Sequence, residues 1–199
     1  MKGFLLEVTE ADLARRRLLG LDRWDEMWEG VLHMAPAPMY EHQRVLDRLI
    51  AFLLPLIERR GRGTLVSGVN VFNEASRKPD YRIPDLTIVA AGHEGLIAED
   101  GIRRGGPDAV LEVRSPEDET YDKFPFFAAL GVREVIVIPR DTKQPEVYRL
   151  AGRQYVAVAP GVEGWVVSEV LGVRFRLLDA EHPVLRVQDA TDPSAQTDI

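Results

Sequence analysis

Residues 84–138 decide the fold, and they include PDLTIV (84–89), AVLEVRSP (109–116) and VIVI (135–138). A short helix carrying Lys123 is expected between the second and the third of these segments. Asp85 and Glu112 are therefore set into or beside apolar strands, where an isolated ionised carboxylate is costly. A bound divalent metal ion could offset this cost, and so could a buried ion pair.

The composition is that of an ordinary globular protein, with 199 residues, 45% hydrophobic and 29% charged. We expect one domain over residues 1–180 and a loose polar tail over 181–199. The absence of cysteine excludes disulfides, zinc–thiolate sites and cysteine nucleophiles. It also suits a reducing compartment.

The formal net charge of -7 argues against a strongly basic nucleic-acid-binding protein. It does not exclude a nuclease, because a nuclease site is itself acidic until a metal ion binds. No apolar run approaches the ~20 residues of a membrane span, and the apolar stretch within residues 1–7 is too short for a signal peptide. We therefore expect a cytoplasmic protein with no membrane partner.

Hydrophobic periodicity predicts the main elements. Helices are expected over 10–18, where Thr9 and Asp12 resemble a capping box, and over 39–60, with a short helical turn over 22–28. Strands are expected over 29–35, 64–73, 86–90, 109–113, 135–138, 146–150, 154–158, 165–167 and 173–177. The segment 109–138 is a βαβ unit, and the chain after residue 140 is predicted to be antiparallel.

The strand around Glu112 places Val110, Glu112 and Arg114 on one face, and Leu111 and Val113 on the other. If this strand pairs with the strand that begins after Asp85, the two carboxylates converge at one side of the sheet. Two carboxylates, completed by phosphate oxygens and water, are the usual way in which proteins hold Mg²⁺.

Lys123 is in helical register with Phe127 and Leu130, so its side chain is expected to face the sheet and to reach the acids. There it could orient a water molecule or stabilise developing negative charge. It could equally form a structural ion pair with Glu112 or Asp85, and the spacing alone leaves both interpretations open.

Four further residues are weaker candidates. His42 lies on a buried helical stripe, where a hydrogen-bonded core histidine is commoner than a ligand. Glu29 and Glu41 could each supply a further acid, although surface positions are commoner for both. Arg114 stays protonated and so cannot act as a base, but it could bind phosphate. The chain has no P-loop, no G-x-S-x-G motif and no His-x-x-x-His pair.

Several motifs occur in an order and spacing that are specific in combination: DEMWEGVLHMAP (25–36), His42, PDL (84–86), LEVRSP (111–116), YDK (121–123) and GVREVIVI (131–138). On these motifs, residues 20–178 resemble the Uma family of putative endonucleases. This family is a branch of the restriction-endonuclease-like PD-(D/E)xK superfamily. The resemblance implies an α/β or α+β fold with a mixed sheet flanked by helices, and an antiparallel C-terminal extension.

The resemblance also implies a site. Asp85 corresponds to the motif aspartate, Glu112 to the motif glutamate, and Lys123 to a lysine displaced onto the following helix. The superfamily pattern places lysine where this chain has Arg114. His42 and Glu29 match family positions, and they are predicted, together with Arg114, to be supporting residues.

The function implied by the resemblance is an endonuclease that hydrolyses DNA with Mg²⁺ or Mn²⁺ held by Asp85 and Glu112, in a homodimer. The β-rich C-terminal half should offer an edge for dimer formation. The alternative is a non-catalytic descendant of the nuclease fold that serves as a binding or assembly module, an alternative motivated by the net charge of -7.

Overall fold

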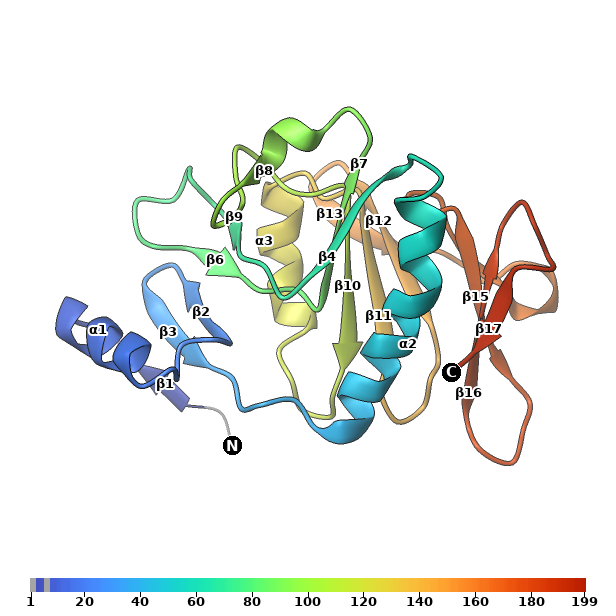
Figure 1. Cartoon of the computed structure of the whole chain (residues 1–199), viewed down its shortest axis with the longest axis horizontal. Helices are drawn as coiled ribbons and strands as arrows, with labels where there is room; N and C mark the ends of the chain where they lie inside the picture. The colour runs from blue at the N-terminus through green and yellow to red at the C-terminus, as the bar shows by residue number, and fades with distance from the viewer. Residues whose placement is uncertain (1–2, 6–7) are drawn as a thin grey trace.

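The computed structural model describes residues 3–5 and 8–199, which form three β-sheets with helices packed on them (Figure 1). Residues 1–2 and 6–7, part of the stretch considered above as a signal peptide, lie outside the described residues. The mixed α+β class is the one predicted from the sequence.

The central sheet has six strands. In spatial order they are β13 (Gln154–Ala157), β12 (Glu146–Ala151), β11 (Glu134–Pro139), β10 (Ala109–Arg114), β7 (Leu86–Ala90) and β4 (Gly63–Ser67). Strands β10 and β11 are parallel, and the other neighbours are antiparallel. The predicted strand–helix–strand unit is therefore confirmed, as is the antiparallel hairpin that follows it.

Helix α2 (Tyr40–Ile57) covers one face of this sheet. Its buried side chains recur at helical spacing: Val45, Leu46, Leu49, Leu53, Leu56 and Ile57. They share a hydrophobic core with Leu111 and Val113 of β10, which is the face predicted to pack on a helix. This contact places the first turn of α2 beside the end of β10.

Helix α3 (Phe124–Ala129) covers the opposite face and follows directly on the 3₁₀ turn η2 (Tyr121–Lys123). Phe127 is fully buried against Val110 and Val135, and burial of such a side chain contributes about 1.5–3 kcal/mol. Pro125 lies in the first turn of α3, where its missing N–H costs no helical hydrogen bond.

A second sheet is formed mainly by the N-terminal part of the chain. Its strands are, in order, β1 (Gly3–Leu5), β3 (Val31–Met34), β2 (Asp25–Trp28), β6 (Tyr81–Arg82), β5 (Val71–Phe72), β9 (Gly101–Ile102) and β8 (Ile97–Ala98). Residues 22–28 were predicted to form a helical turn, and this was wrong because Asp25–Trp28 pairs with β3 as a hairpin. The strand predicted over 64–73 is also divided at Gly68, whose φ of 62° ends β4 before the chain enters β5 in the other sheet.

The third sheet comes from the C-terminal part and contains β14 (Val166–Ser168), β15 (Val173–Leu178), β16 (Val184–Asp189) and β17 (Gln196–Asp198). The prediction that residues 181–199 form a loose polar tail was wrong. Leu185 and Val187 alternate with polar residues along β16 and are fully buried in the core that contains α2. Helix α2 thus lies between the central sheet and this third sheet (Figure 1).

The remaining helical segments are short and peripheral: α1 (Glu10–Leu18), η1 (Glu94–Leu96) and η3 (Val162–Gly164). The predicted capping box of α1 is confirmed, because Thr9 and Asp12 exchange side-chain and backbone hydrogen bonds. Within the described part of the chain, no helix combines the length and the apolar character that crossing a bilayer requires. The cytoplasmic location stays a prediction.

Asp189 makes the third sheet sensitive to acid. Its side chain is fully buried, pairs with Arg60 and accepts hydrogen bonds from Thr191 and from the backbone of Asp192. Burial alone would raise the pKa of Asp189, but these hydrogen bonds and Arg60 outweigh it and lower the pKa to about 2. Because this folded-state pKa lies below that of the unfolded chain, the stabilisation is complete above about pH 4 and is lost as the pH falls towards 2.

We therefore expect Asp189→Asn to lower the free energy of unfolding by about 2 kcal/mol at pH 7. The difference from the wild type should shrink as the pH falls from 4 to about 2. Urea unfolding at several pH values measures it, with Asp179→Asn, at an exposed position beyond β15, as the matched control. A deficit that stays constant with pH would contradict the assignment.

Candidate active site

The two motif carboxylates lie next to each other at one end of the central sheet. Strands β7 and β10 are antiparallel neighbours in which Leu86 is paired with Leu111. Asp85 immediately precedes Leu86, and Glu112 immediately follows Leu111, so both acids lie at the same end. The backbone N–H of Val113 donates to Asp85 Oδ2 at 2.7 Å, which fixes the carboxylate beside β10. The predicted convergence is therefore what the structure has.

Lys123 reaches these acids from the turn η2. Its Nζ lies 3.2 Å from Glu112 Oε1 and 2.8 Å from Glu26 Oε1, and its side chain is 13% exposed. The lysine is thus held between a strand of the central sheet and a strand of the N-terminal sheet. This geometry includes the ion pair with Glu112 that the sequence left as an alternative.

Glu26 is the site residue that the sequence analysis missed. It lies in β2, is 7% exposed, and accepts hydrogen bonds from Lys123 Nζ, from the backbone N–H of Ile83 and from Trp28 Nε1, each at 2.8 Å. The prediction of a helical turn over 22–28 hid this role, because it gave Glu26 no defined inward face. In a strand, Glu26 and Trp28 share one face.

His42 is brought to the site by the first turn of α2. Its Nε2 lies 3.2 Å from Asp85 Oδ2, and its side chain is 12% exposed. Its Nδ1 is buried and has no hydrogen-bond partner among the described residues. His42 can therefore orient Asp85, in line with the supporting role predicted for it.

The other predicted candidates lie outside this set. Glu29 is exposed in the turn between β2 and β3, and Glu41 pairs with Lys143 at 3.0 Å. Arg114 shares a strand face with Glu112, but its guanidinium lies over the Tyr121 ring at 5.0 Å from the centroid. None of these three side chains lines the cavity at the site, so the structure does not place Glu29 or Arg114 as supporting residues there.

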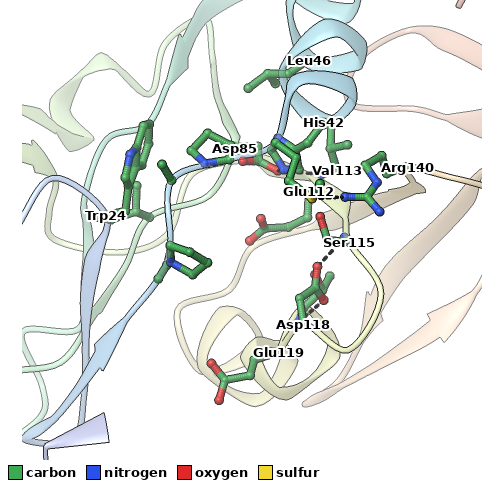
Figure 2. A pocket seen from close by; sticks show the side chains of 18 of the residues that line it. Trp24, His42, Leu46, Asp85, Glu112, Val113, Ser115, Asp118, Glu119 and Arg140 are labelled. Atoms are coloured by element: carbon green, nitrogen blue, oxygen red, sulfur yellow. Dashed lines mark hydrogen bonds and ion pairs between the residues drawn. The ribbon is translucent and has the colours of Figure 1, made fainter. Parts of the chain in front are cut away.

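The assembled side chains border a cavity of about 890 Å³ (Figure 2). Its walls come from the N-terminal sheet, the central sheet and α2. Asp85, Glu112, Glu26 and Lys123 all line it, together with the indole of Trp24. A cavity of this size is in the range of small-molecule sites, roughly 300–1,000 Å³.

Burial dominates the electrostatics of the site. It raises the pKa of Glu112 to about 8, since Lys123 offsets only part of the desolvation and Asp85 and Glu26 add repulsion. For Lys123, burial lowers the pKa, but Glu112 and Glu26 outweigh it and the pKa rises above its ordinary value. Lys123 therefore stays protonated and can act as a cation or a hydrogen-bond donor but not as a base.

The donor set suits a metal ion that needs few protein ligands. Among the described residues, no three His, Asp or Glu side chains are arranged as a complete metal-binding cluster. The hydrogen bonds described above use Oδ2 of Asp85 and Oε1 of Glu112, so each carboxylate has a second oxygen to offer. Mg²⁺ commonly binds one or two carboxylates and retains several waters, whereas a structural zinc site needs four protein ligands. The residues present fit Mg²⁺ or Mn²⁺.

Known proteins share the sequence pattern and the fold. The model of the Uma2 family, described as "Putative restriction endonuclease", matches residues 21–181. A putative nuclease of DUF820 from Anabaena variabilis ATCC 29413 has a similar crystal structure, with a TM-score of 0.59 and 14% sequence identity over 74% of this chain and 82% of that chain. At such low identity the likeness shows a shared fold alone. No curated protein sequence matches this chain. Because the family model spans most of the chain, this protein belongs to the Uma2 family of putative restriction endonucleases.

Proposed function

We propose that the protein is a metal-dependent endonuclease that hydrolyses phosphodiester bonds of DNA. The observation that carries the proposal is the convergence of Asp85, Glu112 and Lys123 at one cavity. Two carboxylates suit a divalent cation that assists phosphodiester hydrolysis, and a protonated lysine beside them can stabilise developing negative charge.

Asp85 and Glu112 would hold Mg²⁺ or Mn²⁺, which would polarise a phosphoryl oxygen and offset the negative charge that develops there. Lys123 would donate a hydrogen bond to the attacking water or to the phosphate. Glu26 would keep Lys123 in place, and His42 would orient Asp85. Arg114 has no role in this scheme.

Nicking of supercoiled plasmid in Mg²⁺ tests the proposal. We expect Asp85→Asn, Glu112→Gln and Lys123→Met each to lower the cleavage rate by more than about a hundredfold, because each removes a metal ligand or the cation that contacts Glu112. Chelation of the metal should stop cleavage by the wild type. Glu29→Gln, at an exposed acid outside the cavity, is the control and should retain full activity. Cleavage that survives both carboxylate substitutions would refute the proposal.

A non-catalytic binding or assembly module is the second candidate. It is favoured by the ion pairs that Lys123 forms with Glu112 and Glu26, which could serve stability alone, and by the net charge of -7. The two candidates differ in what they expect of a divalent cation, because only the nuclease requires one at Asp85 and Glu112.

Calorimetric titration with Mn²⁺ separates the two candidates. The nuclease should bind Mn²⁺ through both carboxylates, and the ion must displace the proton that Glu112 holds up to a pH of about 8. We therefore expect the affinity to rise about tenfold per pH unit from pH 6 to near 8 and then to level off. Glu112→Gln should abolish binding. No binding by the wild type at any of these pH values would favour the non-catalytic module.

The proposal includes a homodimer formed through the edge of the central sheet. Strand β13 is the last strand on one side of that sheet, and Val156 on it is 58% exposed. An exposed apolar edge strand offers unpaired backbone groups to a second copy. Because charge on an edge strand opposes such pairing, Val156→Lys should convert the dimer to monomer.

Sedimentation velocity at micromolar concentration measures this change. Val162→Lys, at a position that is 88% exposed and lies in η3, away from this edge, is the matched control and should leave the dimer intact. A wild type that sediments only as a monomer would exclude the dimer.

A further inference from the structure

We propose that the cavity receives one unpaired nucleotide of DNA, with its base stacked on Trp24, so that the preferred substrate is single-stranded or locally unpaired. This inference rests on the proposed nuclease function and adds the form of DNA that the site accepts.

The volume of the cavity, about 890 Å³, suits a single nucleotide better than a duplex. A B-DNA duplex is wider than its major groove, which alone is about 12 Å across, so two paired strands would lie across the cavity, whereas one unpaired nucleotide can enter it. A single nucleotide is the size of the ligands that occupy cavities of this volume. A phosphodiester bond can therefore reach the carboxylates at the cavity wall if its nucleotide leaves the base stack.

Trp24 is built into the wall in a way that holds its indole in place. The residue is half-buried and lies just before β2. Its ring edge packs on Gly68, where a Cβ atom would come within 3.2 Å of Trp24 Cζ3. The guanidinium of Arg23 lies 5.0 Å from the ring centroid. A fixed indole is suited to stacking, because little side-chain freedom is lost when a base packs on it.

Trp24 and the two carboxylates line the same cavity at different places. Figure 2 shows Trp24 on one side of the cavity and Arg140 on the other, with Asp85 and Glu112 between them in this view. Apolar side chains that also line the cavity include Met34, Pro36, Pro38 and Leu46. The cavity thus offers an apolar wall for a base and a separate group of charged residues for the phosphate.

The charge of the lining disfavours the many phosphates of a duplex. Six acids line the cavity, Glu26, Asp85, Glu112, Glu117, Asp118 and Glu119, against three side chains with a fixed positive charge, Arg23, Lys123 and Arg140. A duplex brings two rows of phosphates to this surface, and most of its affinity would have to come from phosphate neutralisation. Base stacking supplies about 1–3 kcal/mol per base without that requirement.

Fluorescence anisotropy tests the inference. The probe is a fluorescein-labelled DNA of about 12 nucleotides, offered as a single strand or as a blunt duplex, with Ca²⁺ in place of Mg²⁺ to prevent cleavage. We expect the wild type to bind the single strand more tightly than the duplex. Trp24→Ala should weaken single-strand binding about ten- to a hundredfold, and Trp24→Tyr should recover most of it. Tyr40→Ala is the matched control, at an aromatic residue that is 81% exposed and does not line the cavity.

Two results would overturn the inference: tighter binding of the duplex by the wild type, or equal effects of Trp24→Ala and Tyr40→Ala. If Trp24→Ala does not fold by circular dichroism, the comparison of single strand with duplex in the wild type and in Trp24→Tyr decides the question.

The same probes distinguish this inference from the proposed nuclease function. Metal-dependent cleavage with a preference for duplex would refute only the inference that the substrate is unpaired. Binding that depends on Trp24, with no cleavage of either probe in Mg²⁺, would refute only the proposed nuclease activity.

Discussion

The structure depends on the buried contact of Lys123 with Glu26 and Glu112. Lys123 belongs to the crossover between β10 and β11, Glu112 to the central sheet, and Glu26 to the N-terminal sheet. One ammonium group therefore joins the crossover and the central sheet to a strand that is 97 residues away in sequence from Lys123. Removal of one partner from a buried ion pair leaves an uncompensated charge and typically costs 3–5 kcal/mol. The relative position of the two sheets, and with it the shape of the cavity between them, depends on this contact.

Helix α2, which forms another wall of the cavity, is positioned by apolar packing rather than by charge. Helix α2 is held on both sides, by Leu111 in the central sheet and by Phe175 and Val187 in the third sheet. This double burial fixes the first turn of α2, from which His42 reaches Asp85. The C-terminal strands are thus part of the framework that positions a residue at the site, although none of them lines the cavity.

The sequence predicted the parts of the fold whose signal is local. Strong apolar periodicity identified α2 and the βαβ unit, and the motif spacing brought Asp85, Glu112 and Lys123 together correctly. The errors arose where long-range pairing decides the structure. Strand β2 carries two buried acids, Asp25, which pairs with Arg16, and Glu26, which pairs with the distant Lys123, so its pattern does not resemble a buried strand. The sequence signal for this hairpin is Gly30, because a type I′ two-residue turn requires positive φ, which Glu29 and Gly30 both adopt. Recognition of that hairpin would have placed Glu26 rather than Glu29 on the inward face.

The number of charges at the site supports the proposed metal ion independently of the motif. A structural ion pair needs one carboxylate for each lysine, but Lys123 is accompanied by Glu26, Asp85 and Glu112. With all three acids ionised, the set carries two negative charges in excess, which is the charge of one divalent cation. Without such a cation, burial and mutual repulsion keep a proton on Glu112 up to a pH of about 8. A protein that used this contact only for stability would gain by replacing the surplus acids with apolar residues of similar size. The retained acids are best explained if the site accommodates a second, divalent positive charge together with a substrate phosphate.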